Sequence, residues 1–288
     1  MLPPAIIDTH QHLWNLSQFE LGWLKEEPFC QLHRDHTLED YSRDTAELNV
    51  TQSIYMEVDV LESQQPREAQ WILDLCQQPN NCVAAAVISG RPGTEGFGEY
   101  VEQFRKSPFL KGVRDNLYGK PQGYCSRKDF VADIRMLGEA RLSFDIETPT
   151  EGLPDAARLI DACPETQFIL DHCGNPMIRS GDLTTWQANV AAVAQRKNVV
   201  VKISGLFTWV DPERWSIDDI APVMNHLWEH FGPDRVMFGS DWPVVTMVAP
   251  YRRWVEVVSE VASNRNQEIQ RKLFHNNASR VYGLTNSL

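Results

Sequence analysis

The sequence predicts an α/β protein with a (β/α)8 TIM-barrel fold, in which residues 1–288 form one domain. Eight short runs of apolar and β-branched residues recur along the chain, and segments with helical periodicity separate them. Apolar strands that alternate with amphipathic helices are typical of a parallel sheet covered by helices. Eight such units in about 250 residues match a barrel. An open doubly wound sheet is the alternative, but no glycine-rich fingerprint follows the first strand to favour it.

The expected elements follow one another along the chain. Strands are expected at 5–14, 53–59, 82–90, 110–117, 142–149, 167–176, 199–207 and 235–244. Helices are expected at 37–48, 65–77, 98–105, 128–140, 153–162, 183–196 and 217–231, and further helices between 249 and 281 end the chain. Residues 15–36 form a long irregular segment, whose aromatic residues favour packing over disorder. Because it follows the first strand, we expect it to be an active-site loop.

Composition and charge exclude several classes of partner. A net charge of −12 is unfavourable for binding nucleic acid or an anionic membrane surface, since both require a positive face. No run approaches the roughly 18 apolar residues of a membrane span, and the first residues lack the pattern of a signal peptide. Six cysteines without CxxC spacing suit reduced thiols. We expect a cytoplasmic protein that acts on a small molecule, and the sequence does not indicate its oligomeric state.

Polar residues gather where the expected strands end, which is where barrel enzymes place their active sites. In strand order they are His10 and His12, Glu57 and Asp59, Arg114, Asp145 and Glu147, His172, Lys202 and Ser204, and Asp241. His10 and His12 face the same side, because strand side chains alternate with a period of two. The eighth strand of a barrel lies beside the first, so Asp241 should approach both histidines.

Each of these residues also has a structural interpretation. An isolated pair of histidines is often structural, and Asp241 could be a helix N-cap that Pro243 follows. Arg114 and Lys202 could be ion-pair partners. The other histidines lie in loop or helix contexts, and we expect them to be structural: His33, His36, His226, His230 and His275. Histidines and an aspartate that converge on one barrel mouth favour a functional site over independent accidents.

The motifs at these strand ends resemble those of the amidohydrolase superfamily. They are "DTHQHLW" at 8–14, "GVR" at 112–114, "DHCG" at 171–174, "GSDWP" at 239–243 and "NNASRVYGL" at 276–284. They look most like the sugar-lactonase branch, which includes L-fuconolactone and L-rhamnonolactone hydrolases and the pyrone-dicarboxylate lactonases. The resemblance implies an amidohydrolase-like barrel and a hydrolase that opens the ester ring of a small lactone, with a sugar (aldono-) lactone as the preferred substrate.

The resemblance also implies candidate metal ligands. Binuclear amidohydrolases carry a bridging lysine or carboxylate on the fourth strand and a histidine on the fifth, whereas this sequence has Arg114 on the fourth and carboxylates on the fifth. We therefore expect at most one ion, Zn²⁺ or another divalent metal, with the candidate ligands His10, His12, His172 and Asp241. In the alternative, metal-free catalysis, the three histidines would donate hydrogen bonds to the lactone carbonyl.

Lactone hydrolysis assigns a role to each candidate. Asp241 is the expected general base, because its carboxylate can take a proton from water. Arg114 is expected to bind a substrate oxygen, and the other expected substrate contacts are Trp14, Glu57, Asn116, Trp209 and Trp242. A metal-dependent decarboxylase and a lactonase for a dicarboxylate lactone are alternative activities. A sugar-acid-binding protein is a third alternative, against which Asp241 argues because binding alone needs no base.

Overall fold

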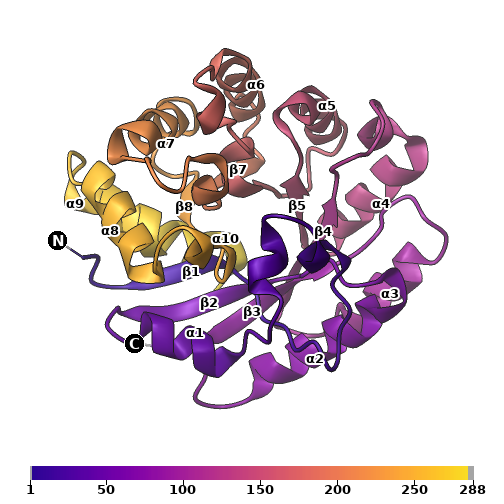
Figure 1. The fold of residues 1–288 in the computed structure, drawn as a ribbon. Coiled ribbons are helices and arrows are strands. Elements are labelled where there is room, and N and C mark those ends of the chain that lie inside the picture. The colour runs from indigo at the N-terminus through magenta and orange to yellow at the C-terminus, as the bar shows by residue number, and fades with distance from the viewer. Residues whose placement is uncertain (1, 285–288) are drawn as a thin grey trace.

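Eight parallel strands form the centre of the protein in a computed structural model that describes residues 2–284 (Figure 1). They pair in chain order: β1 (Ile6–Gln11), β2 (Val50–Met56), β3 (Val83–Ser89), β4 (Leu110–Asn116), β5 (Ser143–Glu147), β6 (Phe168–Leu170), β7 (Val199–Ile203) and β8 (Val236–Phe238). The chain after β8 returns to β1, where the Asp241 amide donates to the His10 carbonyl oxygen at 2.8 Å and the His12 amide to that of Trp242 at 2.8 Å. The predicted TIM barrel is therefore confirmed.

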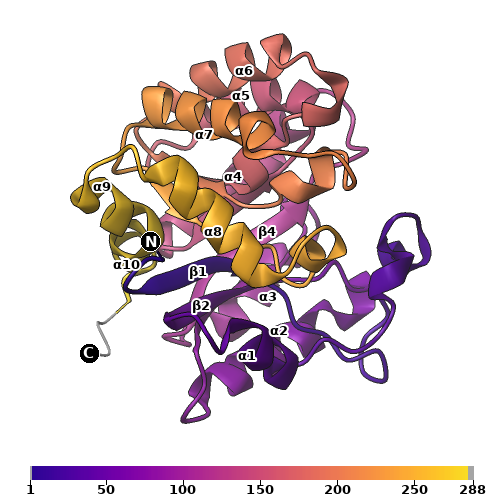
Figure 2. The same ribbon diagram turned by 60° about the vertical axis from the view of Figure 1, so that its left-hand side comes forward.

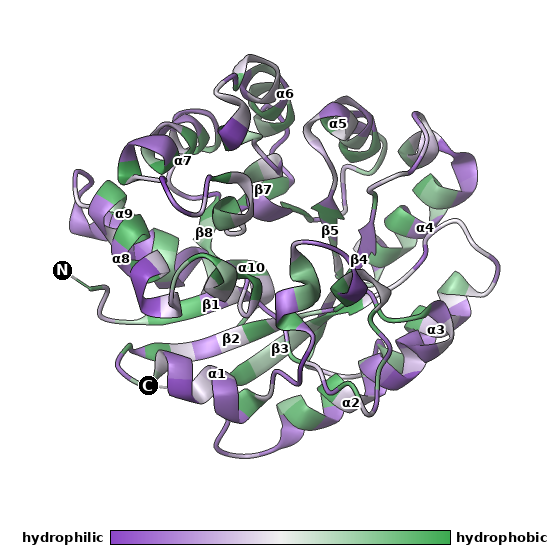
Figure 3. Cartoon of the chain, viewed as in Figure 1, coloured by the Kyte–Doolittle hydropathy of each residue, from purple (hydrophilic) through white to green (hydrophobic). Residues whose placement is uncertain are grey.

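Helices surround the barrel, as the sequence predicted (Figure 1). They are α1 (Leu38–Thr45), α2 (Gln65–Gln77), α3 (Phe97–Phe104), α4 (Lys128–Glu139), α5 (Leu153–Ala162), α6 (Thr184–Ala194), α7 (Ile217–Phe231), α8 (Tyr251–Ala262), α9 (Gln267–Arg271) and α10 (Asn277–Tyr282). Figure 2 shows α7 and α8 side by side on the outside of the barrel. Hydrophobic and hydrophilic residues alternate along the outer helices, as amphipathic covering helices require (Figure 3). No helix within residues 2–284 is long and apolar enough to cross a membrane.

Most strands end earlier than predicted, and β6 and β8 fall furthest short of their predicted ends, because the backbone turns sharply where the candidate site begins. β6 ends at Leu170 rather than at residue 176, and β8 ends at Phe238 rather than at residue 244. His172 and Asp241, which follow these strands, have φ values of 49° and 62°. Residues other than glycine adopt a positive φ at a cost in free energy, and such residues cluster at functional sites. The apolar runs thus located the strands but not their ends.

Apolar side chains fill one end of the barrel interior. Ile7, Ile54, Val87, Ile169, Val200 and Met237 belong to this inner cluster, which Ala278 and Tyr282 of α10 complete. The Asn277 side chain of α10 also donates to the carbonyl oxygens of Pro233 and Val236, each at 2.8 Å, so that α10 lies at the amino-terminal end of β8. Alternation along β6 and β7 then points residues two positions further on into the same interior. Those residues are Asp171 and Lys202.

Residues 15–36 form a loop whose two ends are joined. The backbones of Trp14 and His36 exchange hydrogen bonds of 2.9 and 3.0 Å. Two short 3₁₀ turns, Gly22–Lys25 and Phe29–Leu32, lie between these ends. The indole of Trp23 donates to the Val58 carbonyl oxygen at 2.8 Å, which fastens the loop beside the carboxyl end of β2. The loop stands out from one side of the barrel in Figure 2.

Candidate active site

His10, His12 and Asp241 meet at the carboxyl end of β1. The Nε2 atoms of His10 and His12 are 3.2 Å apart. Asp241 Oδ1 lies 3.2 Å from His12 Nε2 and 3.7 Å from His10 Nε2. All three side chains are buried. The return of the chain from β8 to β1 brings these residues together although 229 positions separate His12 from Asp241.

Asp8 fixes the turn that carries Asp241. Asp8 Oδ1 accepts a hydrogen bond from the Ser240 amide at 2.8 Å, and Oδ2 accepts one from the Ser240 hydroxyl at 2.6 Å. The hydroxyls of Tyr41 and Tyr251 donate to Oδ2 at 2.9 and 3.2 Å. Complete burial raises the pKa of Asp8, while the hydrogen bonds from Ser240 oppose that rise. Sequence analysis missed this residue, although an aspartate inside an apolar strand needs such partners.

The three converging side chains fit a single divalent ion. A carbonyl oxygen only accepts hydrogen bonds, so His12 Nδ1, 2.9 Å from the Met56 carbonyl oxygen, carries the proton of the neutral ring. Its Nε2 lone pair then faces His10 and Asp241. Burial holds the pKa of His10 well below its usual range, which keeps the His10 ring neutral.

The distances between the three atoms support the same conclusion. Zn²⁺ bonds of about 2.0–2.1 Å in a tetrahedron place two ligand atoms about 3.3–3.4 Å apart. The observed separations of 3.2, 3.2 and 3.7 Å are close to that value. The three residues therefore form one face of a possible tetrahedral site, with the remaining position open.

His172 lies beside this cluster but outside it. It belongs to the 3₁₀ turn Asp171–Gly174 after β6, and its ring centroid is 4.4 Å from that of His10. Nδ1 lies 2.9 Å from the Ser204 hydroxyl, and Nε2 lies 3.4 Å from Glu147 Oε2. The group of ligand atoms within 4.8 Å of one another contains those of His10, His12 and Asp241 and not those of His172.

A glycine allows this position of His172. Gly205 has a φ of 65°, and a Cβ atom there would come within 2.4 Å of the Nδ1 atom of His172. The backbone that follows β7 can approach the imidazole so closely only without a side chain.

A buried ion-pair network lies beneath the histidines. Lys202 Nζ is 2.7 Å from Asp145 Oδ2 and 2.9 Å from Asp171 Oδ1, and all three side chains are completely buried. Burial opposes the charge of Asp171, but Lys202 and His10 hold its pKa well below the usual range. Burial raises the pKa of Asp145 to about 6. His10 Nδ1 lies 3.5 Å from Asp171 Oδ1, so this network also orients the His10 ring.

Sequence analysis did not include Asp171 among the candidate residues. A signal for it was present, because Lys202 interrupts the apolar run "VVVKIS" and a buried lysine requires a carboxylate partner.

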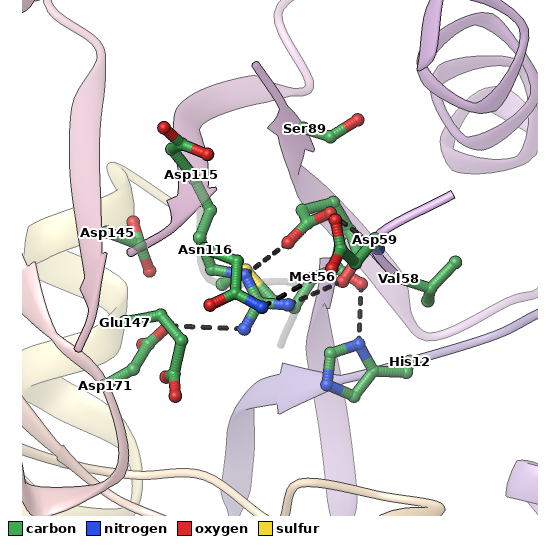
Figure 4. A network of polar contacts seen from close by, with 12 residues as sticks. His12, Met56, Val58, Asp59, Ser89, Asp115, Asn116, Asp145, Glu147 and Asp171 are labelled. Carbon is green, nitrogen blue, oxygen red and sulfur yellow. Dashed lines mark hydrogen bonds and ion pairs between the residues drawn. The ribbon is translucent and has the colours of Figure 1, made fainter. Parts of the chain in front are cut away.

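Arg114 is already engaged by protein groups. Its Nε atom donates to Glu57 Oε1 at 2.6 Å and its Nη2 atom to the Glu57 carbonyl oxygen at 2.9 Å, while Nη1 lies 3.6 Å from Asp171 Oδ2. Arg91 is paired as well, at 2.8 Å from Asp59 and 3.1 Å from Asp115. Figure 4 shows the polar side chains of this region, with Asp59, Asp115 and Glu147 labelled, at the ends of β2, β4 and β5. The structural role that we considered for Arg114 is therefore present.

The tryptophans that we expected at the substrate differ in exposure. Trp14 and Trp242 are each 1 % exposed, and their indole nitrogens donate to the Arg34 carbonyl oxygen and to the Asp44 carboxylate. Both rings contact His36, so they form an aromatic wall under the loop rather than an open face. By contrast, Asn116 and Trp209 are half-buried, and they contact Asp59 and Asn175.

His36 lies inside this aromatic wall. It is 1 % exposed, and neither ring nitrogen has a hydrogen-bond partner within residues 2–284. Burial lowers its pKa to about 4. This histidine is therefore held neutral in an apolar environment.

The Asp241 carboxylate lies against two imidazoles where the strands of the TIM barrel end. This arrangement defines an enzyme that can activate water. The chain belongs to the amidohydrolase family, whose model matches residues 7–284. A relative from Burkholderia multivorans, an L-fucono-1,5-lactonase, is 27% identical over 96% of this chain and 96% of its own length. An L-rhamnono-gamma-lactonase from Scheffersomyces stipitis is 23% identical over 97% of this chain and 98% of its own.

A solved structure has the same fold along the whole chain. It is an amidohydrolase from Burkholderia multivorans with bound zinc, and it covers 98% of this chain and 100% of its own at a TM-score of 0.88 and 25% identity. The predicted family and fold are thus confirmed.

Proposed function

We propose that the protein hydrolyses a sugar (aldono-) lactone by attack of a water molecule that Asp241 activates. The observation that carries this proposal is the position of the Asp241 carboxylate at the barrel mouth, 3.2 Å from His12 Nε2. The names of two relatives that align with nearly the whole chain support the same reaction class.

In the proposed reaction, the water oxygen bonds to the lactone carbonyl carbon while one water proton passes to Asp241. The carbonyl oxygen becomes an oxyanion, and His172 is proposed as a hydrogen-bond donor to it. The ring C–O bond then breaks. Asp241 returns its proton to the leaving alkoxide, so that a hydroxy acid is released and the carboxylate is restored.

We propose His10, His12 and Asp241 as the protein ligands of at most one ion. A divalent ion bound there would supply positive charge that polarises the lactone carbonyl and lowers the pKa of the attacking water. Neither Arg114 nor Lys202 can serve as the ligand that bridges a first and a second ion. Arg114 stays protonated, and Lys202 is held by two carboxylates. Asp241 could act as the base through its other carboxylate oxygen.

The charges around the mouth favour a neutral substrate. A dicarboxylate lactone, or the carboxylated substrate of a decarboxylase, needs cationic groups that are free to bind it. Arg114 and Arg91 are each paired with protein carboxylates. Glu147 adds a further carboxylate beside His172. A polyhydroxylated ring can instead accept and donate hydrogen bonds with such groups, Glu147 and Asn116 among them.

A pH-indicator screen of lactones tests this proposal. Purified protein is given L-fucono-1,5-lactone, L-rhamnono-γ-lactone, other aldonolactones and a dicarboxylate lactone, each with and without a chelator. We expect acid release from the aldonolactones and none from the dicarboxylate lactone. A preference for the dicarboxylate would overturn the substrate, and CO₂ release without lactone hydrolysis would overturn the reaction. Full turnover after chelation would show that no ion is required, and the histidines would then act as hydrogen-bond donors to the carbonyl oxygen.

A further inference from the structure

A second cluster of metal-ligating side chains lies on the outside of the barrel. His226, Glu229 and His230 are part of α7, and one ligand atom from each lies within 4.8 Å of the others. Residues spaced by three and four positions share one face of a helix. The segment "HLWEH" thus presents two imidazoles and a carboxylate in one direction, although sequence analysis expected these histidines to be only structural.

The surroundings of His226 engage one of its two ring nitrogens. Its Nε2 atom lies 3.0 Å from the carbonyl oxygen of Gln187 in α6, and because a carbonyl only accepts, Nε2 carries the proton. The Nδ1 atom of the neutral ring then has an available lone pair. The ring also packs against Trp186, with centroids 5.1 Å apart. A histidine that donates its other N–H to a backbone carbonyl is the usual second-shell arrangement of a metal ligand.

We propose that His226, Glu229 and His230 form a separate binding site for one divalent transition-metal ion, of the Zn²⁺, Ni²⁺ or Cu²⁺ class. Two imidazoles and one carboxylate suit these ions, whereas Ca²⁺ and Mg²⁺ prefer oxygen ligands alone. The His226 and His230 ring centroids are 4.3 Å apart, and one ligand atom from each of the three side chains lies within 4.8 Å of the others. The three ligands leave the remaining positions of the ion to water.

This site changes how metal content is interpreted. A protein with two equivalents of zinc would hold one ion at the barrel mouth and one on α7, rather than a bridged pair. Stoichiometry alone therefore does not reveal a binuclear active site, and the two ions must be separated by substitution. The proposal does not depend on the lactonase reaction.

Equilibrium dialysis against Zn²⁺ tests the site, first with the parent chain, His230→Gln, His12→Gln and the double variant. We expect His230→Gln to remove one equivalent, or to weaken its binding at least about tenfold, in both the parent and the His12→Gln background. Glu229→Gln should weaken the same equivalent. His33→Gln replaces an exposed histidine outside the cluster and should change nothing.

Lactone turnover by His230→Gln is expected to match the parent, because α7 lies outside the barrel. Titration with Cu²⁺ gives a second readout, since an ion at His226 would quench Trp186 fluorescence and His230→Gln should reduce that quenching. Equal Zn²⁺ binding and equal quenching in the parent and His230→Gln would overturn the proposal, as would a parent chain that binds no Zn²⁺ outside the barrel mouth.

Discussion

Replacement of Asp241 by asparagine separates its chemical role from its structural role. The substitution keeps the shape of the side chain but removes its charge and its capacity to take a proton. The backbone amide at this position still donates to the His10 carbonyl oxygen at 2.8 Å. The new side-chain amide can donate to His12 Nε2, which lies 3.2 Å from Oδ1 in the parent. We therefore expect a folded protein with a thermal unfolding temperature close to that of the parent.

The expected loss is in turnover. A positioned general base contributes about 10²–10⁴-fold, so kcat should fall by that factor, equivalent to about 3–5 kcal/mol in the activation barrier. Initial rates with an aldonolactone, followed with a pH indicator, measure the change. Asp44→Asn is the control, because it removes a carboxylate that contacts the neighbouring Trp242 indole outside the cluster. Near-normal turnover by the folded Asp241→Asn variant would refute the assignment of the base.

Three further substitutions, two of them paired with a control variant, test the surroundings of the site. Asp8→Asn replaces a buried acceptor of several hydrogen bonds. We expect it to lower both the unfolding temperature and kcat, with little change in KM. An unchanged kcat would make the role of Asp8 purely structural. Gly205→Ala and Gly181→Ala both place a side chain at a left-handed position, which costs about 1–2 kcal/mol of stability, but only the first also meets a site histidine, so it should cost more and should lower kcat, as unfolding curves and initial rates would show. Because burial lowers the pKa of His36 to about 4, the native state resists its protonation, so stability is complete above about pH 6.5 and is lost as pH falls towards 4. Denaturant unfolding at pH 7 and pH 4 should show that His36→Gln removes about 3 kcal/mol of this acid-induced loss, whereas His33→Gln should leave it intact.

The order of the elements could be predicted from the sequence because it follows from local patterns. Apolar runs alternate with amphipathic segments, and α2, α5 and α7 have the predicted bounds. The carboxyl ends of β6 and β8 could not be predicted, since their apolar runs continue into residues with positive φ. Hydrophobicity does not report the sign of φ.

The partners of the charged residues could not be predicted for a related reason. Sequence shows which residue types stand near strand ends, but not which carboxylate meets which cation. Arg114 pairs with Glu57, 57 positions away, and Lys202 pairs with Asp145 at the same separation. The burial of Trp14 likewise depends on how the loop closes, which only the three-dimensional packing reveals.

The buried carboxylates of the barrel interior account for the positions of two buried cations, Lys202 and Arg114. Lys202 lies against Asp145 and Asp171, and Arg114 lies against Glu57 and, more distantly, Asp171. Two cations therefore serve three carboxylates in the barrel interior. Both cations are paired within this network, and among the described residues neither forms an ion pair with Asp241.

Asp241 therefore meets the histidines rather than these cations. Among the described residues, its ion-pair contacts are with His10 and His12. A buried carboxylate without positive charge is costly, and a divalent ion bound by the three residues would supply that charge. His12 Nδ1 is committed to the Met56 carbonyl oxygen, so Nε2 is the atom that would bind the ion.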